Sequence, residues 1–137
     1  MNPGCRVRVW YSAGCVRAIS VKGLGEGASS AGFAAPTVLV VTVLTSAADA
    51  SPELLNERLA AAVAADCGGV VCAASDLSVI RTAVPDILTV VPGIRPAGGA
   101  VHDQQRVATP ADAIRSGASI LVLGRAITAA PDPAEAA

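Results

Sequence analysis

From Thr37 onward, apolar segments rich in β-branched residues alternate with segments whose apolar residues recur at helical spacing. The apolar segments are nearly continuous runs, which is typical of strands covered on both faces of a sheet. Strands that alternate with helices require right-handed crossovers and therefore form a parallel sheet. The predicted strands are, in chain order, TVLVVTVLTS, GVVCAAS, ILTVVPGI and SILVLGRAIT.

Capping signals mark the helices between these strands. Residues 51–53, Ser-Pro-Glu, supply an N-cap, a proline at the first helical position and an acid in the first turn. Residues 109–112, Thr-Pro-Ala-Asp, resemble a capping box with aspartate in place of the usual glutamate. A shorter helix is predicted to begin at residues 75–76.

The order β-α-β-α-β-α-β predicts half of a (β/α)8 TIM barrel, a fold that takes about 250 residues when complete. We expect a partial barrel that covers roughly strands five to eight. A small open doubly wound sheet is the alternative, although no G-x-G-x-x-G turn follows any strand. Residues 1–36 show no clear period, and the barrel interpretation requires at least one strand and one helix among them.

Composition limits the classes of function. The chain is 53% hydrophobic, which argues against disorder, and its net charge of -1 gives no reason to expect nucleic acid or an anionic membrane as a partner. The longest apolar run, Ala34 to Leu44, is too short to span a bilayer, which takes about 20 residues. No secretory signal opens the chain, so we expect a cytoplasmic protein with reduced cysteines.

The cysteine and histidine content argues against a metal site. The four cysteines show no C-x-x-C spacing, and His102 is the single histidine. We therefore expect no bound metal, and we interpret Cys67 and Cys72 as buried, inert thiols.

Two arginines follow predicted strands at their carboxyl ends, where ligands bind in parallel α/β folds. Arg95 comes directly after the third strand, beside Gly93, and Arg125 follows the fourth, beside Gly124. In a barrel these would be the last two strands, whose loops frequently form a phosphate site. A glycine lets the backbone approach an anion, and arginine offers a planar donor fork, so the pattern favours an anion site.

The segment from Val91 to Pro110 is much longer than an ordinary strand-to-helix connection, and long loops of this kind commonly bind ligands. It contains P-G-I-R at residues 92–95 and D-Q-x-R-x-x-T-P at residues 103–110, and L-G-R-x-I-T follows at residues 123–128. With these motifs, the chain from about Val38 to Pro133 closely resembles the second half of bacterial orotidine 5'-phosphate decarboxylase.

The resemblance implies roles for individual residues. Arg95 and Gln104 match ligand-binding positions of the loop that closes over the substrate phosphate. Gly124 and Arg125 match the phosphate-binding turn after the last strand, and Thr45 matches the residue that helps to hold the pyrimidine. The family motif assigns nothing to the lone histidine.

The resemblance also implies a reaction. The family converts orotidine 5'-phosphate to UMP and CO2 without metal or organic cofactor, and it works as a homodimer. Its catalytic group resembles an Asp-x-Lys-x-x-Asp motif, whose lysine protonates the developing carbanion. Lys22, the single lysine, has no aspartate at either required position. We therefore expect no catalytic residue in this chain, and no activity from the chain alone.

Two explanations of this half-match remain open. Residues 37–137 are interpreted as the C-terminal half of a decarboxylase-like barrel, and residues 1–36 as a divergent or mistranslated segment of a fragment or frame-shifted gene. Alternatively, the chain is a real half-barrel that pairs with another half. A non-catalytic half-barrel that binds phosphate or acts as a scaffold is the alternative from a different functional class.

Overall fold

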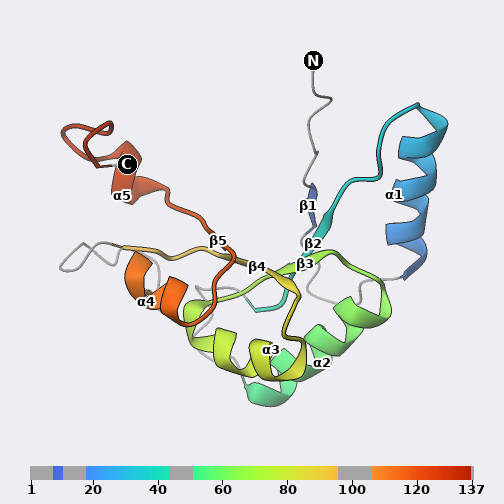
Figure 1. Cartoon of the computed structure of the whole chain (residues 1–137), viewed down its shortest axis with the longest axis horizontal. Coiled ribbons are helices and arrows are strands. Elements are labelled where there is room, and N and C mark those ends of the chain that lie inside the picture. The colour runs from blue at the N-terminus through green and yellow to red at the C-terminus, as the bar shows by residue number, and fades with distance from the viewer. Residues whose placement is uncertain (1–7, 11–17, 44–50, 96–105, 137) are drawn as a thin grey trace.

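The structure is a computed structural model, and it describes residues 8–10, 18–43, 51–95 and 106–136 (Figure 1). Its strands form one parallel sheet in which each strand pairs with its neighbour in the chain, in the order β1-β2-β3-β4-β5. The strands are β1 Arg8–Trp10, β2 Val38–Val41, β3 Gly69–Val71, β4 Leu88–Val91 and β5 Ile120–Leu121. The helices are α1 Ala18–Ser30, α2 Pro52–Ala64, the 3-10 helix η1 Ala74–Asp76, α3 Leu77–Ala83, α4 Pro110–Arg115 and α5 Arg125–Thr128.

This architecture confirms the prediction of a partial α/β barrel. Strands β2 to β5 lie in the four segments predicted after Thr37, and helices separate them as expected. The strand β1 and the helix α1 provide the elements that the barrel interpretation required before residue 37. Among the helices described, none has the length and apolar character needed to cross a bilayer.

The predicted helix caps are present. Ser51 is the N-cap of α2, and its hydroxyl accepts a hydrogen bond from Leu54 N at 3.2 Å. Thr109 caps α4 in the same way, with Asp112 N donating to its hydroxyl at 3.1 Å. Each bond satisfies one of the amides that a helix leaves open at its start.

The last predicted strand differs from its prediction. The segment SILVLGRAIT forms only the short strand β5, and its second part is the helix α5. The amide of Val122 still donates to Val91 O at 2.9 Å, which extends the pairing with β4 by one residue. Gly124 O then accepts hydrogen bonds from two amides inside α5, at 2.9 and 3.1 Å. Strand pairing therefore gives way to helical hydrogen bonding at this glycine.

Helices α2, α3 and α4 lie on one side of the strands (Figure 1), and the core fills the space between them and the sheet. The side chains at alternate positions of β2, Val38 and Val40, belong to this core, as expected for a pleated strand. The largest fully buried side chains are Leu77, Ile80, Ile94, Val70, Val91, Thr42, Thr89 and Cys72.

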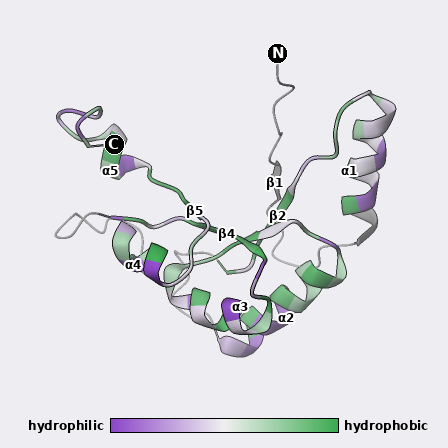
Figure 2. Cartoon of the chain, viewed as in Figure 1, coloured by the Kyte–Doolittle hydropathy of each residue, from purple (hydrophilic) through white to green (hydrophobic). Residues whose placement is uncertain are grey.

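The region around β5 is much more open than the rest of the sheet. Ile120 and Val122 are each 45% exposed, whereas Leu39 in β2 is 2% exposed. Figure 2 shows the apolar character of the stretch between β5 and α5. In the part of the chain that the structure describes, β5 pairs with β4 alone, so the side of the sheet at β5 is left open.

Candidate functional site

The candidate site starts at the carboxyl end of β4. In parallel sheets ligands bind at the carboxyl ends of the strands, here called the carboxyl edge. The chain leaves β4 through Gly93, whose φ of 78° lies in the region that glycine adopts readily. Ile94 then forms an isolated parallel bridge with Ala108. Arg95 N donates to Ala108 O at 2.9 Å, and Ala108 N donates to Gly93 O at 3.3 Å. The chain that returns toward α4 is therefore tied to residues 93–95.

Arg95 is held against this edge with its guanidinium buried. The residue is 9% exposed, and its Nη1 donates to Ile94 O at 2.8 Å. Its Nε is buried, and no group among the described residues accepts a hydrogen bond from it. A buried guanidinium N–H without an acceptor is costly, so this geometry favours an added anion or other acceptor at Arg95.

A second charged group at the same edge is an ion pair. Arg106 Nη1 lies 2.7 Å from Asp76 Oδ1, and the two side chains are 16% and 9% exposed respectively. Asp76 also accepts hydrogen bonds from Ser75 Oγ at 3.1 Å and from Ala73 N at 3.3 Å. The motifs assign this pair no role, although Arg106 is the last residue of D-Q-x-R. Nothing in the sequence indicated that its partner would come from η1.

Gly124 and Arg125 lie where the sequence analysis expected them, immediately beyond β5 and at the start of α5. Both are exposed, and a Cβ added to Gly124 would meet nothing within 4 Å. The backbone here is therefore open to a ligand. Because β4 and β5 are parallel neighbours, their carboxyl ends bring the segments that carry Arg95 and Arg125 to one edge of the sheet.

Two predicted site residues, Thr45 and Gln104, lie outside the described residues, and so does His102. Segment 96–105, which carries Gln104, follows Arg95 in the chain. Lys22 is an exposed residue of α1.

The two cysteines that the structure describes lack the features of a reactive site. Cys67 and Cys72 are buried and free, as the sequence predicted. Burial, followed by the negative charge of Asp76, raises the pKa of Cys72 to about 12, and burial likewise raises the pKa of Cys67. Such thiols stay protonated near neutral pH and are poor nucleophiles. The described residues contain no group of three or more histidine, cysteine, aspartate or glutamate side chains placed to hold a metal ion.

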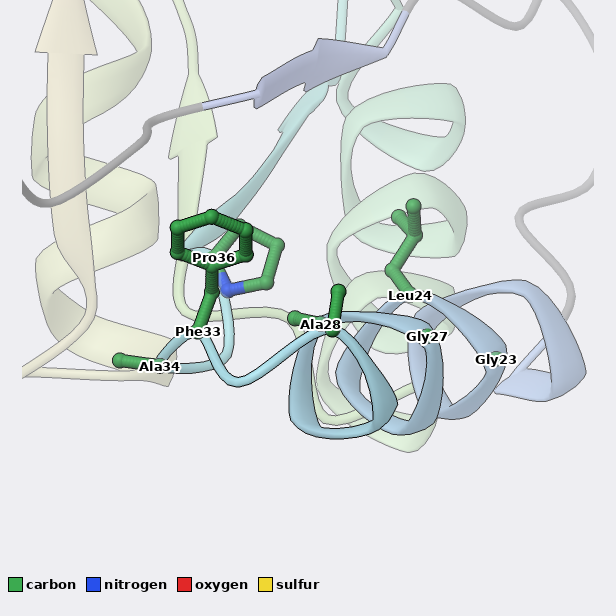
Figure 3. A pocket seen from close by; sticks show the side chains of 8 residues that line it. Gly23, Leu24, Gly27, Ala28, Phe33, Ala34 and Pro36 are labelled. Atoms are coloured by element: carbon green, nitrogen blue, oxygen red, sulfur yellow. The ribbon is translucent and has the colours of Figure 1, made fainter.

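A groove of about 340 Å³ lies elsewhere, between α1 and the segment that leads to β2 (Figure 3). Its walls are apolar or formed by glycine, and no side chain in its lining carries a charge. We therefore place the candidate site at the carboxyl edge of the sheet and not in this groove. The groove is lined by Gly23, Leu24, Gly27, Ala28, Ala31, Phe33, Ala34 and Pro36.

Comparison with known proteins shows the family to which the chain belongs. Residues 12–137 match the model of the family described as "Orotidine 5'-phosphate decarboxylase / HUMPS family". The chain belongs to this family. The match begins inside segment 1–36, which the sequence analysis left unassigned; the boundary at residue 37 remains a prediction.

Curated relatives are orotidine 5'-phosphate decarboxylases. The one from Anaeromyxobacter sp. (strain K) is 49% identical over 129 residues, covering 86% of this chain and 53% of that protein. The one from Lactiplantibacillus plantarum is 42% identical over 127 residues, covering 84% of this chain and 54% of that protein. The chain thus spans about half the length of the curated relatives it matches.

Solved structures agree on the fold. The orotidine 5'-phosphate decarboxylase from Lactobacillus acidophilus superposes with a TM-score of 0.67 at 27% identity, over 93% of this chain and 58% of that one. The enzyme from Sulfolobus solfataricus gives a TM-score of 0.68 over 93% of this chain and 56% of that one, and at 20% identity it supports the fold alone. The partial barrel predicted from the sequence is confirmed by these matches.

Proposed function

We propose that this chain carries the phosphate- and base-binding half of an orotidine 5'-phosphate decarboxylase site. The observation that carries the proposal is Arg95, a buried guanidinium whose Nε has no acceptor among the described residues and which follows a parallel strand at its carboxyl end. A phosphate oxygen supplies the missing acceptor and the opposite charge. The ligands implied are orotidine 5'-phosphate and UMP, which share this phosphate.

Arg125 supports the proposal as the second phosphate-binding arginine. It follows β5, the strand next to β4, and the adjacent Gly124 leaves its backbone open. A bidentate contact between arginine and phosphate contributes about 1.5–3 kcal/mol. The base-binding role of Thr45 and the lid role of Gln104 rest on the motifs alone.

The proposal does not extend to catalysis by this chain alone. A decarboxylase of this family needs a lysine flanked by aspartates, and Lys22 has neither aspartate in place. The lysine lies on α1, a helix whose pocket-forming side is apolar. The homodimer and the absence of a cofactor remain predictions from the resemblance, and the cytoplasmic location remains a prediction from the sequence itself.

Calorimetric titration of the 137-residue protein with UMP, and separately with uridine, tests the proposal. Because only UMP carries phosphate, Arg125→Ala should weaken UMP binding by ~10–150-fold and leave uridine binding nearly unchanged. Arg115→Ala, an exposed arginine of α4, is the matched control and should change neither. Equal losses for both ligands, or none with Arg125→Ala, would show that the phosphate site lies elsewhere. The same protein should not consume orotidine 5'-phosphate, and turnover that survives Lys22→Ala would refute the assignment of catalysis to residues outside this chain.

A further inference from the structure

We infer that the buried pair Asp76–Arg106 is a positioning device that sets the geometry of Arg95 for anion binding. The inference rests on the proposed function, since it takes Arg95 as a phosphate ligand. It adds a role for two residues to which the motifs assign no contact with substrate.

The contacts of Asp76 identify it as an anchor. One carboxylate oxygen accepts from Arg106 at 2.7 Å and from Ser75 at 3.1 Å, and the other accepts from Ala73 N at 3.3 Å. The residue is 7% exposed, and it belongs to η1, which directly follows the end of β3. The carboxylate is thus held in a buried position just beyond the end of β3.

Arg106 connects Asp76 to the end of the neighbouring strand β4. It lies two positions before Ala108, which bridges Ile94 and exchanges backbone hydrogen bonds with Gly93 and Arg95. The route from η1 to Arg95 therefore consists of one ion pair, two residues of chain and a short parallel ladder. Two backbone hydrogen bonds, at 2.9 and 3.3 Å, join Ala108 to the end of β4, and the ion pair of Arg106 adds a side-chain contact to them.

The pair is better suited to positioning than to ligand binding. A carboxylate repels phosphate, and both oxygens of Asp76 already accept hydrogen bonds. Its charge also offsets the charge of Arg106, so the pair as a whole presents little net charge to an anion. A charged hydrogen bond of this kind gains strength and direction from its partly buried setting.

A double-mutant cycle on the 137-residue protein tests the inference, with UMP affinity measured by NMR titration. Asp76→Asn keeps an oxygen for Ala73 N but removes the charge that holds Arg106. It should weaken UMP binding by about 10-fold in the presence of Arg95, and by less than about 2-fold in the Arg95→Ala background. Asp112→Asn breaks the exposed pair with Arg115 on α4 and is the matched control, with no change expected.

The outcomes separate the two proposals. Equal weakening by Asp76→Asn in both backgrounds, or none in either, overturns the positioning role and leaves the phosphate role of Arg95 standing. If Arg95→Ala alone leaves UMP affinity unchanged, the phosphate role of Arg95 fails, and the positioning role fails with it. Asp76→Glu restores the carboxylate and should retain affinity within about 3-fold of the original. If Asp76→Asn does not fold, the cycle is repeated with Arg106→Lys. This variant should weaken UMP binding by about 3-fold, and the effect should vanish in the Arg95→Ala background. Equal weakening in both backgrounds overturns the inference.

Discussion

Replacement of Arg81 by methionine should destabilise the protein more than any other single arginine substitution outside the site. Arg81 in α3 joins that helix to the amino ends of two strands, away from the carboxyl edge that carries Arg95. Methionine keeps the aliphatic length of the side chain and removes the guanidinium. The guanidinium donates to Gly117 O at 2.9 and 2.7 Å, Pro85 O at 2.6 Å, Ile87 O at 2.7 Å, Thr89 Oγ1 at 2.8 Å and Ser119 Oγ at 3.0 Å.

The expected loss is smaller than the full sum of these bonds. The bonds to Pro85 O and Ser119 Oγ are exposed, so water replaces the guanidinium there. Gly117 O keeps a hydrogen bond from Thr89 Oγ1 at 3.3 Å, and Thr89 Oγ1 keeps one from Ser119 N at 3.0 Å. Ile87 O loses a bond in a part-buried position. Since hydrogen bonds to charged groups contribute about 1.5–3 kcal/mol and part of that is recovered, we expect a loss of about 2–4 kcal/mol in the free energy of unfolding.

Urea denaturation followed by circular dichroism measures this loss. Arg115→Met is the matched control, because Arg115 forms an exposed pair with Asp112 on α4 and should contribute less than about 1 kcal/mol. A loss below about 1 kcal/mol for Arg81→Met, or one equal to that of Arg115→Met, would refute the reasoning. A natively folded Arg81→Met protein should also keep its UMP affinity, since Arg81 and its hydrogen-bond partners lie at the opposite end of the strands.

Two further predictions concern the centre of the sheet. Gly69→Ala would place a Cβ 2.6 Å from Leu88 O and 2.9 Å from Leu88 Cβ, so β3 and β4 must separate. Urea denaturation should show a loss of about 2–4 kcal/mol in the free energy of unfolding. The control Gly27→Ala, whose Cβ would meet nothing within 4 Å, should change that free energy by no more than about 1 kcal/mol. Burial raises the pKa of Cys72 from 9.0 to about 12, so between these values the folded protein keeps a proton that the unfolded chain releases. This group should therefore leave the free energy of unfolding unaffected below pH 9. Between pH 9 and 12 it should lower that free energy by up to about 1 kcal/mol per pH unit. Cys72→Ala should flatten that part of the stability curve, and an unchanged slope would contradict the assignment.

The helices and their start points could be predicted from the sequence, because capping residues and apolar spacing act over only a few neighbouring residues. The caps at Ser51 and Thr109 depend on residues within one turn, and both formed as predicted. The short strand β5 could not be predicted from its apolar run, since strand length depends on pairing with neighbours. The run ends at Gly124, where the backbone turns into α5 and leaves Val122 exposed.

The site was predictable in part. Arg95 and Arg125 were placed at strand ends by pattern, and the structure shows them there. The pairing of Asp76 with Arg106 joins residues from two different loops, and no periodicity links them in the sequence. The unsatisfied Nε of Arg95 likewise depends on the residues that surround it in the folded chain, and these are distant in the sequence.

The order of the strands has a consequence for how the protein is made. Each strand pairs with the one synthesised just before it, as Arg8 pairs with Val38 and Val90 pairs with Ile120. Every pairing therefore closes a loop of roughly 30 residues or fewer, for which the entropic cost is modest. A ribosome that releases the chain at about 5–20 residues per second delivers each β-α unit complete before the next emerges. The sheet can thus grow one strand at a time during translation, and each newest strand serves as the template for its successor.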